Sequence, residues 1–260
     1  MPETIAATPT KLSVNLNAVA FLRNRRDMPW PSVVDTARLV LDAGAHGITV
    51  HPRPDQRHIR FTDVHDLAAV IASDYPEAEF NVEGYPSRDF LDLAMASKAH
   101  QVTLVPDDPG QSTSDHGWQV EQNQNLLNRA IETLHANGQR VSLFVDVNAA
   151  DVCAAGDVGA DRIEFYTGPY AALFERSEHG AELGRLNDAA QAARQAGHNA
   201  QPGSRGLIMN AGHDLTLSNL PALKEAVPDL AEVSIGHGIT ADALVMGFPE
   251  AVRRYLQVLS

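Results

Sequence analysis

Short apolar runs alternate along the whole chain with longer segments in which apolar residues recur every three or four positions. The short runs fit buried strands, and the longer spacing, as in Leu127, Ile131 and Leu134, fits the buried face of a helix. The pattern predicts eight strands separated by helices. The strands are expected near residues 12–18, 47–51, 79–84, 101–106, 140–146, 161–167, 206–211 and 232–237.

Turns of small residues precede several of these strands. The segments 42–45, 136–138 and 157–160 each contain a glycine, which can take the left-handed conformation that closes a helix. Eight repeated strand–helix units favour an α/β fold of the (β/α)₈ class, the TIM barrel, over an open doubly wound sheet. A glycine-rich dinucleotide fingerprint after the first strand is missing, which also disfavours a Rossmann fold.

Two segments are longer than a simple strand–helix unit requires. Residues 107–121 are polar and rich in turn residues, and we expect a loop that orders over a substrate. Residues 170–197 predict an extra helical segment. Helix breaks at Gly180 and Gly184 are expected to divide it into two helices. Because no interdomain linker is visible, we expect one catalytic domain over residues 12–260 after a disordered tail over residues 1–11.

Composition narrows the class of protein. The chain has 260 residues, of which 44% are hydrophobic and 20% charged, enough for a large core. Its net charge of −13 argues against binding to nucleic acid or to an anionic membrane. No signal peptide or membrane span is visible. The single cysteine, Cys153, excludes an intrachain disulfide and is expected to be a small buried side chain, so we expect a cytoplasmic protein.

Chemically active residues follow the second predicted strand. His51, Arg53, Arg57 and His58 lie within eight residues on a loop stiffened by two prolines. Imidazoles titrate near neutral pH and guanidinium groups bind phosphate with paired donors. The segment therefore indicates an anion site with proton transfer, although a solvated surface loop remains the alternative.

Two glutamates lie at the ends of other strands. Glu83 ends the third strand, where partial burial would raise its pKa and suit it to act as a base. The alternative is a structural ion pair with an arginine. Glu164 is expected to point into the barrel, where a charge is costly unless it is paired or catalytic. It is a second acid–base candidate.

The last two strands end in Gly-His pairs. His213 follows the seventh strand and His237 follows the eighth. In TIM barrels the loops after these strands often bind phosphate, and glycines such as Gly212 and Gly236 let backbone N–H groups approach the oxygens. For His237, helix capping is the alternative.

Metal and covalent lysine chemistry have little support. The chain has 11 histidines but no His-x-x-x-His pattern on a helix and no acidic cluster at ligand spacing. No Gly-x-Ser-x-Gly turn suggests a nucleophilic serine. The lysines, Lys11, Lys98 and Lys224, do not occupy predicted strand ends. We therefore expect no metal and no cofactor.

Seven motifs together resemble one known family over nearly the whole chain. They are Val14-Asn15-Leu16, Leu22-Arg23-Asn24-Arg25-Arg26, Gly47-Ile48-Thr49-Val50-His51, Arg57-His58-Ile59, Val141-Ser142-Leu143-Phe144-Val145-Asp146, Asn210-Ala211-Gly212-His213 and Ile235-Gly236-His237. In this order they resemble pyridoxine 5′-phosphate synthases. The resemblance implies a TIM barrel that condenses 1-deoxy-D-xylulose 5-phosphate with 3-amino-2-oxopropyl phosphate in vitamin B6 biosynthesis, without metal or organic cofactor. It also implies a homo-oligomer built from dimers, an octamer.

The resemblance also assigns roles. His51 and Glu83 match proton acceptors, and His213 matches the proton donor. The positions that match binding of the deoxyxylulose phosphate are Arg53, His58 and Thr113. The positions that match binding of the amino-ketone phosphate are Asn15, Arg26, Gly236 and His237.

The chain departs from the family pattern at three places. Asn17 and Ala18 stand where the family commonly has Asp-His, which removes an ionisable pair expected near the sugar phosphate. Asp214 follows the donor histidine where the family usually has glycine, and its carboxylate would repel a bound phosphate unless it is turned away or paired. Gly84 and Tyr85 follow Glu83 in place of the commoner Met-Ala.

Two other functions fit the same residues. A phosphosugar epimerase or isomerase on the same barrel would use similar acids and bases. A non-catalytic barrel that binds a phosphorylated metabolite would accommodate the departures at Asn17, Ala18 and Asp214.

Overall fold

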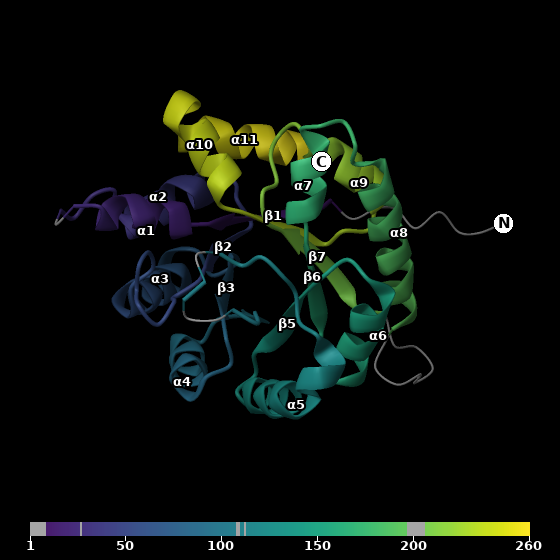
Figure 1. The fold of residues 1–260 in the computed structure, drawn as a ribbon. Helices are drawn as coiled ribbons and strands as arrows, with labels where there is room; N and C mark the ends of the chain where they lie inside the picture. The colour runs from purple at the N-terminus through teal and green to yellow at the C-terminus, as the bar shows by residue number, and fades with distance from the viewer. Residues whose placement is uncertain (1–8, 27, 108–109, 112, 197–205) are drawn as a thin grey trace.

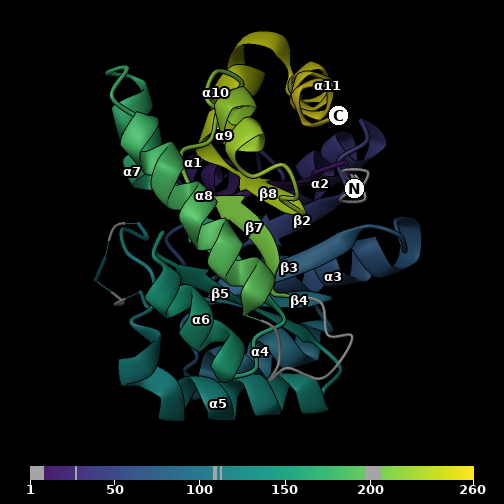
Figure 2. The ribbon, with the colours of Figure 1, turned by 90° about the vertical axis from the view of Figure 1, so that its right-hand side faces the viewer.

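Eight parallel strands close into a barrel in the computed structural model, which describes residues 9–26, 28–107, 110–111, 113–196 and 206–260. Each strand pairs with the next in the chain, and β8 pairs with β1. Helices surround the strands on the outside (Figures 1 and 2). The strands are β1 (Lys11–Asn15), β2 (Gly47–Val50), β3 (Glu79–Gly84), β4 (Gln101–Leu104), β5 (Arg140–Val145), β6 (Arg162–Tyr166), β7 (Ile208–Gly212) and β8 (Glu232–Ile235).

Each strand is followed by at least one helix, so the predicted TIM barrel is confirmed. The helices within the described residues are α1 (Asn17–Asn24), α2 (Val33–Asp42), α3 (Phe61–Asp74), α4 (Arg88–Ser97), α5 (Val120–Ala136), α6 (Ala149–Asp157), α7 (Gly168–Phe174), α8 (Gly180–Gln195), α9 (Leu220–Ala226), α10 (His237–Met246) and α11 (Phe248–Leu259).

The hydrophobic core lies between the strands and the surrounding helices. Alternate residues of β1, such as Leu12 and Val14, are fully buried with helix residues such as Val40 and Leu67 in one apolar cluster. Because successive side chains of a strand point to opposite faces, the residues between them point into the barrel. Burial of this outer layer is the main stabilising contribution to the fold.

The barrel interior is polar, unlike the branched apolar layers common in this fold. The hydroxyl oxygens of Ser13 and Thr49 are 2.7 Å apart, and the Thr103 hydroxyl donates to the Asn81 amide oxygen over 3.0 Å. The Asn81 amide nitrogen donates in turn to Thr49 over 3.4 Å. Inward-facing polar side chains therefore satisfy one another across neighbouring strands.

A charged cluster occupies the amino-terminal end of the barrel. Arg140 pairs with Glu79 over 2.6 Å, and Arg162 lies 3.4 Å from Glu79 and 3.9 Å from Glu232. All four residues start their strands. Burial, followed by the nearby Glu79 charge, raises the pKa of Glu232 to about 8 despite the two arginines. This end of the barrel is held by ion pairs and is remote from the strand ends named in the sequence analysis.

The first strand is shorter than expected. It ends at Asn15, and α1 begins at Asn17, within the range 12–18 assigned to the strand. The Asn15 side-chain oxygen accepts the backbone N–H of Asn17 over 2.9 Å. This local turn competes with the strand ladder and starts the helix.

The segment 170–197 contains part of α7 and all of α8. Gly180 begins α8, as expected, but Gly184 lies inside that helix and does not break it. Side-chain contacts explain the difference, because Leu186, Ala189 and Ala193 of α8 are buried against the barrel and hold the helix across the glycine. Residue 197 lies outside the described residues.

Three further predictions concern the surface and the start of the chain. Cys153 is exposed, so the prediction of a buried side chain is wrong. On α6 the neighbouring Val152 and Ala154 are buried, and Cys153 lies between them on the outward side. Of the predicted tail, residues 1–8 lie outside the described residues, while Thr10 is buried and β1 starts at Lys11. None of the described helices has both the length and the apolar composition of a membrane span.

Candidate active site

The chemically active residues of the sequence analysis meet at the carboxyl ends of the strands. His51 directly follows β2 and Glu83 lies near the end of β3. Their side chains are buried, with the His51 Nδ1 atom 4.0 Å from the Glu83 Oε2 atom. The Asn15 amide, from the end of β1, donates to the same Glu83 oxygen over 3.4 Å. Three strands thus bring these groups together.

Burial makes the two acid–base groups unusual. It lowers the pKa of His51 well below its ordinary value, and the nearby Arg53 adds to the effect. It raises the pKa of Glu83 to about 8, and the Asp107 carboxylate adds to that shift. Near neutral pH the imidazole is therefore neutral and most of the carboxyl is protonated, so their contact is not an ion pair. The alternative of a structural pair between Glu83 and an arginine is not seen among the described residues.

Asn17 replaces the carboxylate expected at its position with a neutral acceptor. Its side-chain oxygen accepts the backbone N–H of His51 over 2.9 Å. An amide can make this bond as well as a carboxylate does, without placing a charge beside the site. Asn17 thus contributes to the position of His51 through a contact that does not need a charged side chain.

Arg53 and His58 form the next part of the site. Arg53 is buried and forms an ion pair with Asp107, which also accepts a hydrogen bond from Ser114 over 2.7 Å. The His51 and His58 rings are 6.1 Å apart. Burial, with Arg53 close by, lowers the pKa of His58 to about 4, so this imidazole is neutral at physiological pH. Arg53 is the permanent positive charge of this pair.

The described residues of the segment after β4 reach across the strand ends. The Gln111 carbonyl oxygen accepts from Arg53 over 3.2 Å and from Arg57 over 2.7 Å. The Thr113 hydroxyl lies 3.1 Å from the Nε2 atom of His213. The segment therefore contacts the loops that follow β2 and β7. Its ordering over a substrate stays a prediction.

His213 is held on several sides at the end of β7. Its Nδ1 atom lies 2.9 Å from the Asp214 carboxylate, and the Tyr166 ring meets it edge-on with ring centres 5.0 Å apart. The hydrogen bond from His213 lowers the pKa of Asp214, so this carboxyl is ionised. Asp214 is thus paired with the histidine.

Glu164 points into the barrel, as expected from strand alternation. Its side chain is buried beside Gly212, where an added Cβ atom would lie only 2.1 Å from the Glu164 Oε1 atom. Burial raises the pKa of Glu164 well above its ordinary value, and the carboxyls of Glu83 and Glu232 add to the shift. Burial in the barrel therefore favours the protonated form of this carboxyl.

The residues matched to the amino-ketone phosphate are only partly brought together. Gly236 packs against Asn15, whose Cβ atom would be 3.2 Å from a Cβ added to the glycine. His237 is exposed and begins α10, which gives the site the N–H groups of a helix N-terminus. Arg26 is exposed beyond the end of α1, and no described contact joins it to the other candidates.

Two contributors were missed by sequence reasoning. Asp107 binds Arg53, and Tyr166 packs on His213. Asp107 starts the polar loop after β4, and Tyr166 ends β6, so position at a strand end was the available signal for both. Among the described side chains, no group of three or more His, Cys, Asp or Glu is arranged to hold a metal ion.

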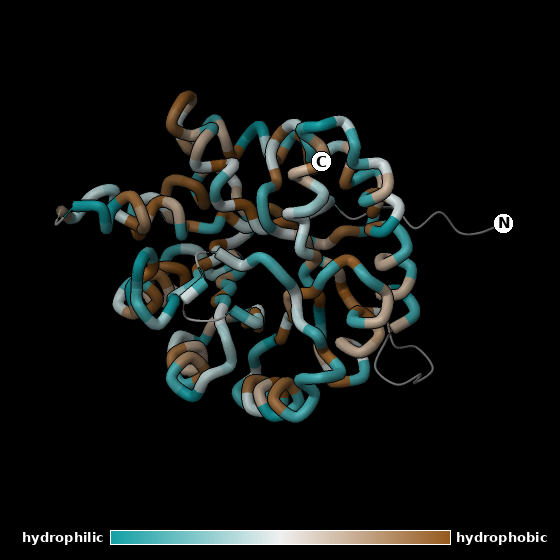
Figure 3. Tube along the Cα trace, in the orientation of Figure 1, coloured by the Kyte–Doolittle hydropathy of each residue, from teal (hydrophilic) through white to brown (hydrophobic). Residues whose placement is uncertain are grey.

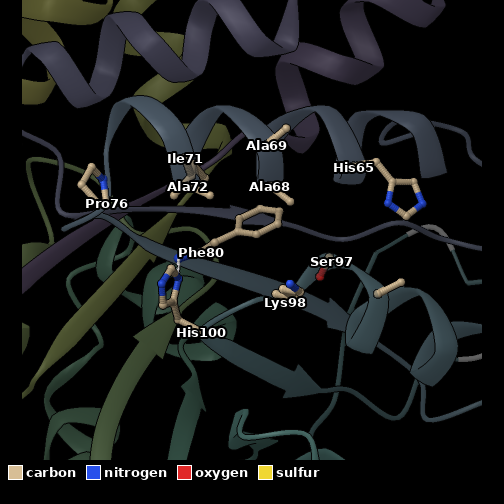
Figure 4. A pocket seen from close by; sticks show the side chains of 11 residues that line it. His65, Ala68, Ala69, Ile71, Ala72, Pro76, Phe80, Ser97, Lys98 and His100 are labelled. Carbon is tan, nitrogen blue, oxygen red and sulfur yellow. Dashed lines mark hydrogen bonds between the residues drawn. The ribbon is translucent and has the colours of Figure 1, made fainter.

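A separate groove lies on the outside of the barrel, between α3 and α4 (Figure 4). It encloses about 480 Å³ and is lined by residues that include Ala68, Phe80, Lys98 and His100. The His100 ring accepts the backbone N–H of Phe80 over 3.0 Å. None of the candidate site residues lines this groove, so the strand ends remain the candidate active site.

Comparison with known proteins decides the family. The family model described as pyridoxal phosphate biosynthesis protein PdxJ matches residues 12–260. This chain belongs to the PdxJ family. A pyridoxine 5′-phosphate synthase of Chelativorans sp. (strain BNC1) is 57% identical over 251 residues, covering 95% of this chain and 98% of the relative. One from Brucella abortus (strain S19) is 55% identical over 253 residues, covering 97% and 99%.

Solved structures that are distant in sequence share the fold of this PdxJ-family chain. A 3-hexulose-6-phosphate synthase superposes with a TM-score of 0.62 at 14% identity, covering 96% of this chain and 100% of that one. A 3-keto-L-gulonate-6-phosphate decarboxylase from Vibrio cholerae gives a TM-score of 0.63 at 10% identity, covering 97% and 100%. At these identities the likeness concerns the barrel alone.

Proposed function

We propose that this chain is a pyridoxine 5′-phosphate synthase of vitamin B6 biosynthesis. It condenses 1-deoxy-D-xylulose 5-phosphate with 3-amino-2-oxopropyl phosphate and releases pyridoxine 5′-phosphate, inorganic phosphate and water. Family membership over residues 12–260 carries the proposal. It favours this reaction over sugar-phosphate epimerisation and over binding without catalysis.

The candidate acid–base residues at the strand ends differ in ionisation state. This difference supports a mechanism in which each residue carries out a different proton transfer. A neutral, buried His51 has a free lone pair and accepts a proton directly. Glu83 becomes an effective base as the pH approaches about 8, the value to which burial raises its pKa. Glu164, kept protonated, can donate a hydrogen bond to an oxygen that gains negative charge during the reaction. His213 donates a proton from the opposite strand.

The phosphate groups of both substrates must be bound at the carboxyl ends of the strands. Arg53, His58 and Thr113 are proposed for one phosphate, which must displace the Asp107 carboxylate from Arg53 or share the remaining guanidinium donors. Asn15, Gly236 and His237, at the N-terminus of α10, are proposed for the other. The role of Arg26 stays a prediction.

We also propose that the protein is a cytoplasmic homo-oligomer. As the family resemblance implies, it would be an octamer built from dimers. Apolar side chains exposed on one part of the molecule support association. Leu244 and Val245 on α10 are 77% and 88% exposed, and Phe21 and Leu22 on the neighbouring α1 are about half exposed. The outer end of α10 is strongly hydrophobic (Figure 3). Such a patch on a monomer would be unusual.

The decisive assay mixes the purified protein with both phosphorylated substrates and measures pyridoxine 5′-phosphate and released phosphate. Each substrate alone serves as a control, and Asp188→Asn, an exposed position on α8, controls for charge neutralisation. No product from folded protein would reject the function. Product formation that persists unchanged in His213→Asn and Glu83→Gln would retain the function and reject the site.

A further inference from the structure

The side chain of His213 has a different partner at each ring nitrogen. The Nδ1 atom lies 2.9 Å from the Asp214 Oδ2 atom, and the Nε2 atom lies 3.1 Å from the Thr113 hydroxyl. The edge-on Tyr166 ring restricts the imidazole from a third side. A carboxylate can only accept, so the nitrogen that faces Asp214 must carry a hydrogen.

We propose that Asp214 is a positioning residue that makes Nε2 the proton-donating nitrogen of His213. The inference rests on the proposed function. In the protonated ring both nitrogens carry hydrogen, and the Nε2–H proton passes to the substrate. The neutral ring that remains keeps its Nδ1–H bond to Asp214, and an external proton later restores Nε2–H. The carboxylate stays ionised throughout and keeps its hydrogen bond to Nδ1–H before and after transfer.

The backbone at this position supports a role for the carboxylate. His213 has φ +88° and Asp214 has φ +56°, so two consecutive residues other than glycine adopt positive φ. Glycine would adopt this conformation without the cost of about 1 kcal/mol that an L side chain brings. For the stability of the fold alone, glycine would therefore be more favourable than aspartate at position 214. A carboxylate that acts on His213 would explain why an aspartate is present despite this cost.

Other titratable groups surround this pair. Tyr166 comes from β6, and its pKa is raised by burial and then by the charges of Asp214, Asp115 and Asp146. His237, at the start of α10, lies close enough to help lower the pKa of Asp214. Because Asp214 is already bonded to His213, its charge is partly compensated before a phosphate binds near α10. This pairing reduces the repulsion between the Asp214 carboxylate and a bound phosphate that the sequence suggests.

The test compares Asp214→Asn and Asp214→Gly with the wild type, with Asp188→Asn as the control for loss of an exposed carboxylate. Single-turnover formation of pyridoxine 5′-phosphate is measured at neutral pH. In Asp214→Asn and Asp214→Gly the Nδ1–H group of His213 loses its carboxylate partner, so the ring is no longer held with Nε2 toward the substrate. The rate should therefore fall about tenfold in both variants and stay unchanged in Asp188→Asn.

Two further readouts separate positioning from a structural role. In nitrogen-15 NMR the neutral His213 ring, assigned by its loss in His213→Asn, should carry hydrogen on Nδ1 in the wild type and shift toward Nε2–H in Asp214→Gly. The same glycine variant should unfold at an equal or higher temperature, since the backbone strain is relieved. Slower turnover in a protein of undiminished stability is the expected combination.

The outcomes are distinct. If the wild type forms product but both Asp214 variants keep its rate and its tautomer, Asp214 does not position His213 and the inference fails. If Asp214→Gly unfolds at a clearly lower temperature, the residue serves the fold instead. If the wild type forms no product, the proposed function fails, while the tautomer measurement still tests the pairing.

Discussion

At the scale of single residues, the site depends on acids that burial keeps uncharged. Glu83 and Glu164 lie inside a barrel whose other carboxyls oppose their ionisation. A charge placed there would lose the solvation of bulk water. The same burial that makes these residues poor ion-pair partners makes them suitable for proton transfer near neutral pH.

The charge state of Glu83 predicts how the rate depends on pH. If Glu83 acts as a base it must be ionised, and its pKa of about 8 means that only a small fraction is ionised at lower pH. The single-turnover rate should rise as pH increases toward about 8 and then level off. Glu83→Gln should lower the rate by about 100- to 10,000-fold and remove this rise. A variant rate that keeps the wild-type pH dependence would exclude Glu83 as the base.

The same shift predicts a change in stability with pH. The folded-state pKa of Glu83 is raised above its ordinary value of 4.5, so its stabilising contribution is complete below that value and is lost as pH rises through about 8. Glu83→Gln stays neutral throughout. The unfolding free energy of the variant relative to the wild type should therefore increase between these limits. Urea unfolding near each limit measures the difference, and a constant difference would contradict the prediction.

Residue positions were predictable from sequence more readily than residue states. His51, Glu83 and His213 could be placed at one face because parallel strands end together. The neutrality of Glu83 and the pairing of Arg53 with Asp107 depend on the distances and burial that all the strands create together. No local pattern contains that information.

At the scale of elements, α10 is fixed by a close backbone approach. A Cβ atom on Gly238 would lie 2.3 Å from the Leu215 carbonyl oxygen, so the first turn of α10 packs directly on the segment after β7. This contact sets the direction in which the helix N-terminus points. Gly238, two residues after the Gly236 proposed for phosphate binding, thus determines where the helix lies.

Gly238→Ala should move this helix start and weaken phosphate binding. We expect the dissociation constant for inorganic phosphate to rise about tenfold, equivalent to about 1.4 kcal/mol, as N–H contacts are lost. Gly184→Ala is the matched control, because open space surrounds Gly184 within α8. That control should leave binding unchanged and stabilise the protein by about 0.5–1 kcal/mol. Isothermal titration with phosphate measures the dissociation constants. Equal losses of affinity in both variants would refute the proposed helix site.

Element types were predictable because periodicity survives in a single sequence, but their ends were not. The expected strand over 12–18 ends early because one side chain, Asn15, bonds the backbone at Asn17. The continuous α8 passes through Gly184 because of buried contacts on its other face. Such local and tertiary contacts decide boundaries where propensity gives no clear answer.

At the scale of the whole molecule, the two ends of the barrel have different roles. The carboxyl ends hold the candidate acid–base groups, while the opposite end holds the ion pairs of Arg140 and Arg162 with Glu79, beside the buried Glu232. The alternating pattern predicted the barrel but not this charged end, since the partners are far apart in sequence and only barrel closure brings them together.

Arg162→Met should therefore affect stability without affecting catalysis. It removes one of the two arginines that pair with the buried Glu79 carboxylate and should lower the unfolding free energy by about 3 kcal/mol. Arg38→Met, which removes a half-exposed surface pair, should cost less than about 1 kcal/mol. Denaturant unfolding and kcat/KM are measured for both. A loss of activity in folded Arg162→Met would show that the two ends are coupled.

The exposed apolar side chains of α10 predict which substitution should dissociate the proposed oligomer. Leu244→Asp should shift the protein toward smaller species, because a charge would have to be buried at the interface. Sedimentation velocity measures the assembly. Gln124→Asp, which adds the same charge to the exposed side of α5, should leave it intact. An unchanged mass in Leu244→Asp would exclude this face from the interface.

The pairing of Arg53 with Asp107 has a consequence for the selection of metabolites. A monocarboxylate entering this corner would exchange one singly charged partner of Arg53 for another and gain little. A phosphate monoester brings up to two negative charges and three acceptor oxygens, so it can outcompete the internal carboxylate. If Arg53 binds a phosphate as proposed, Asp107 would thereby favour phosphate monoesters over monocarboxylates at this position, before any substrate arrives.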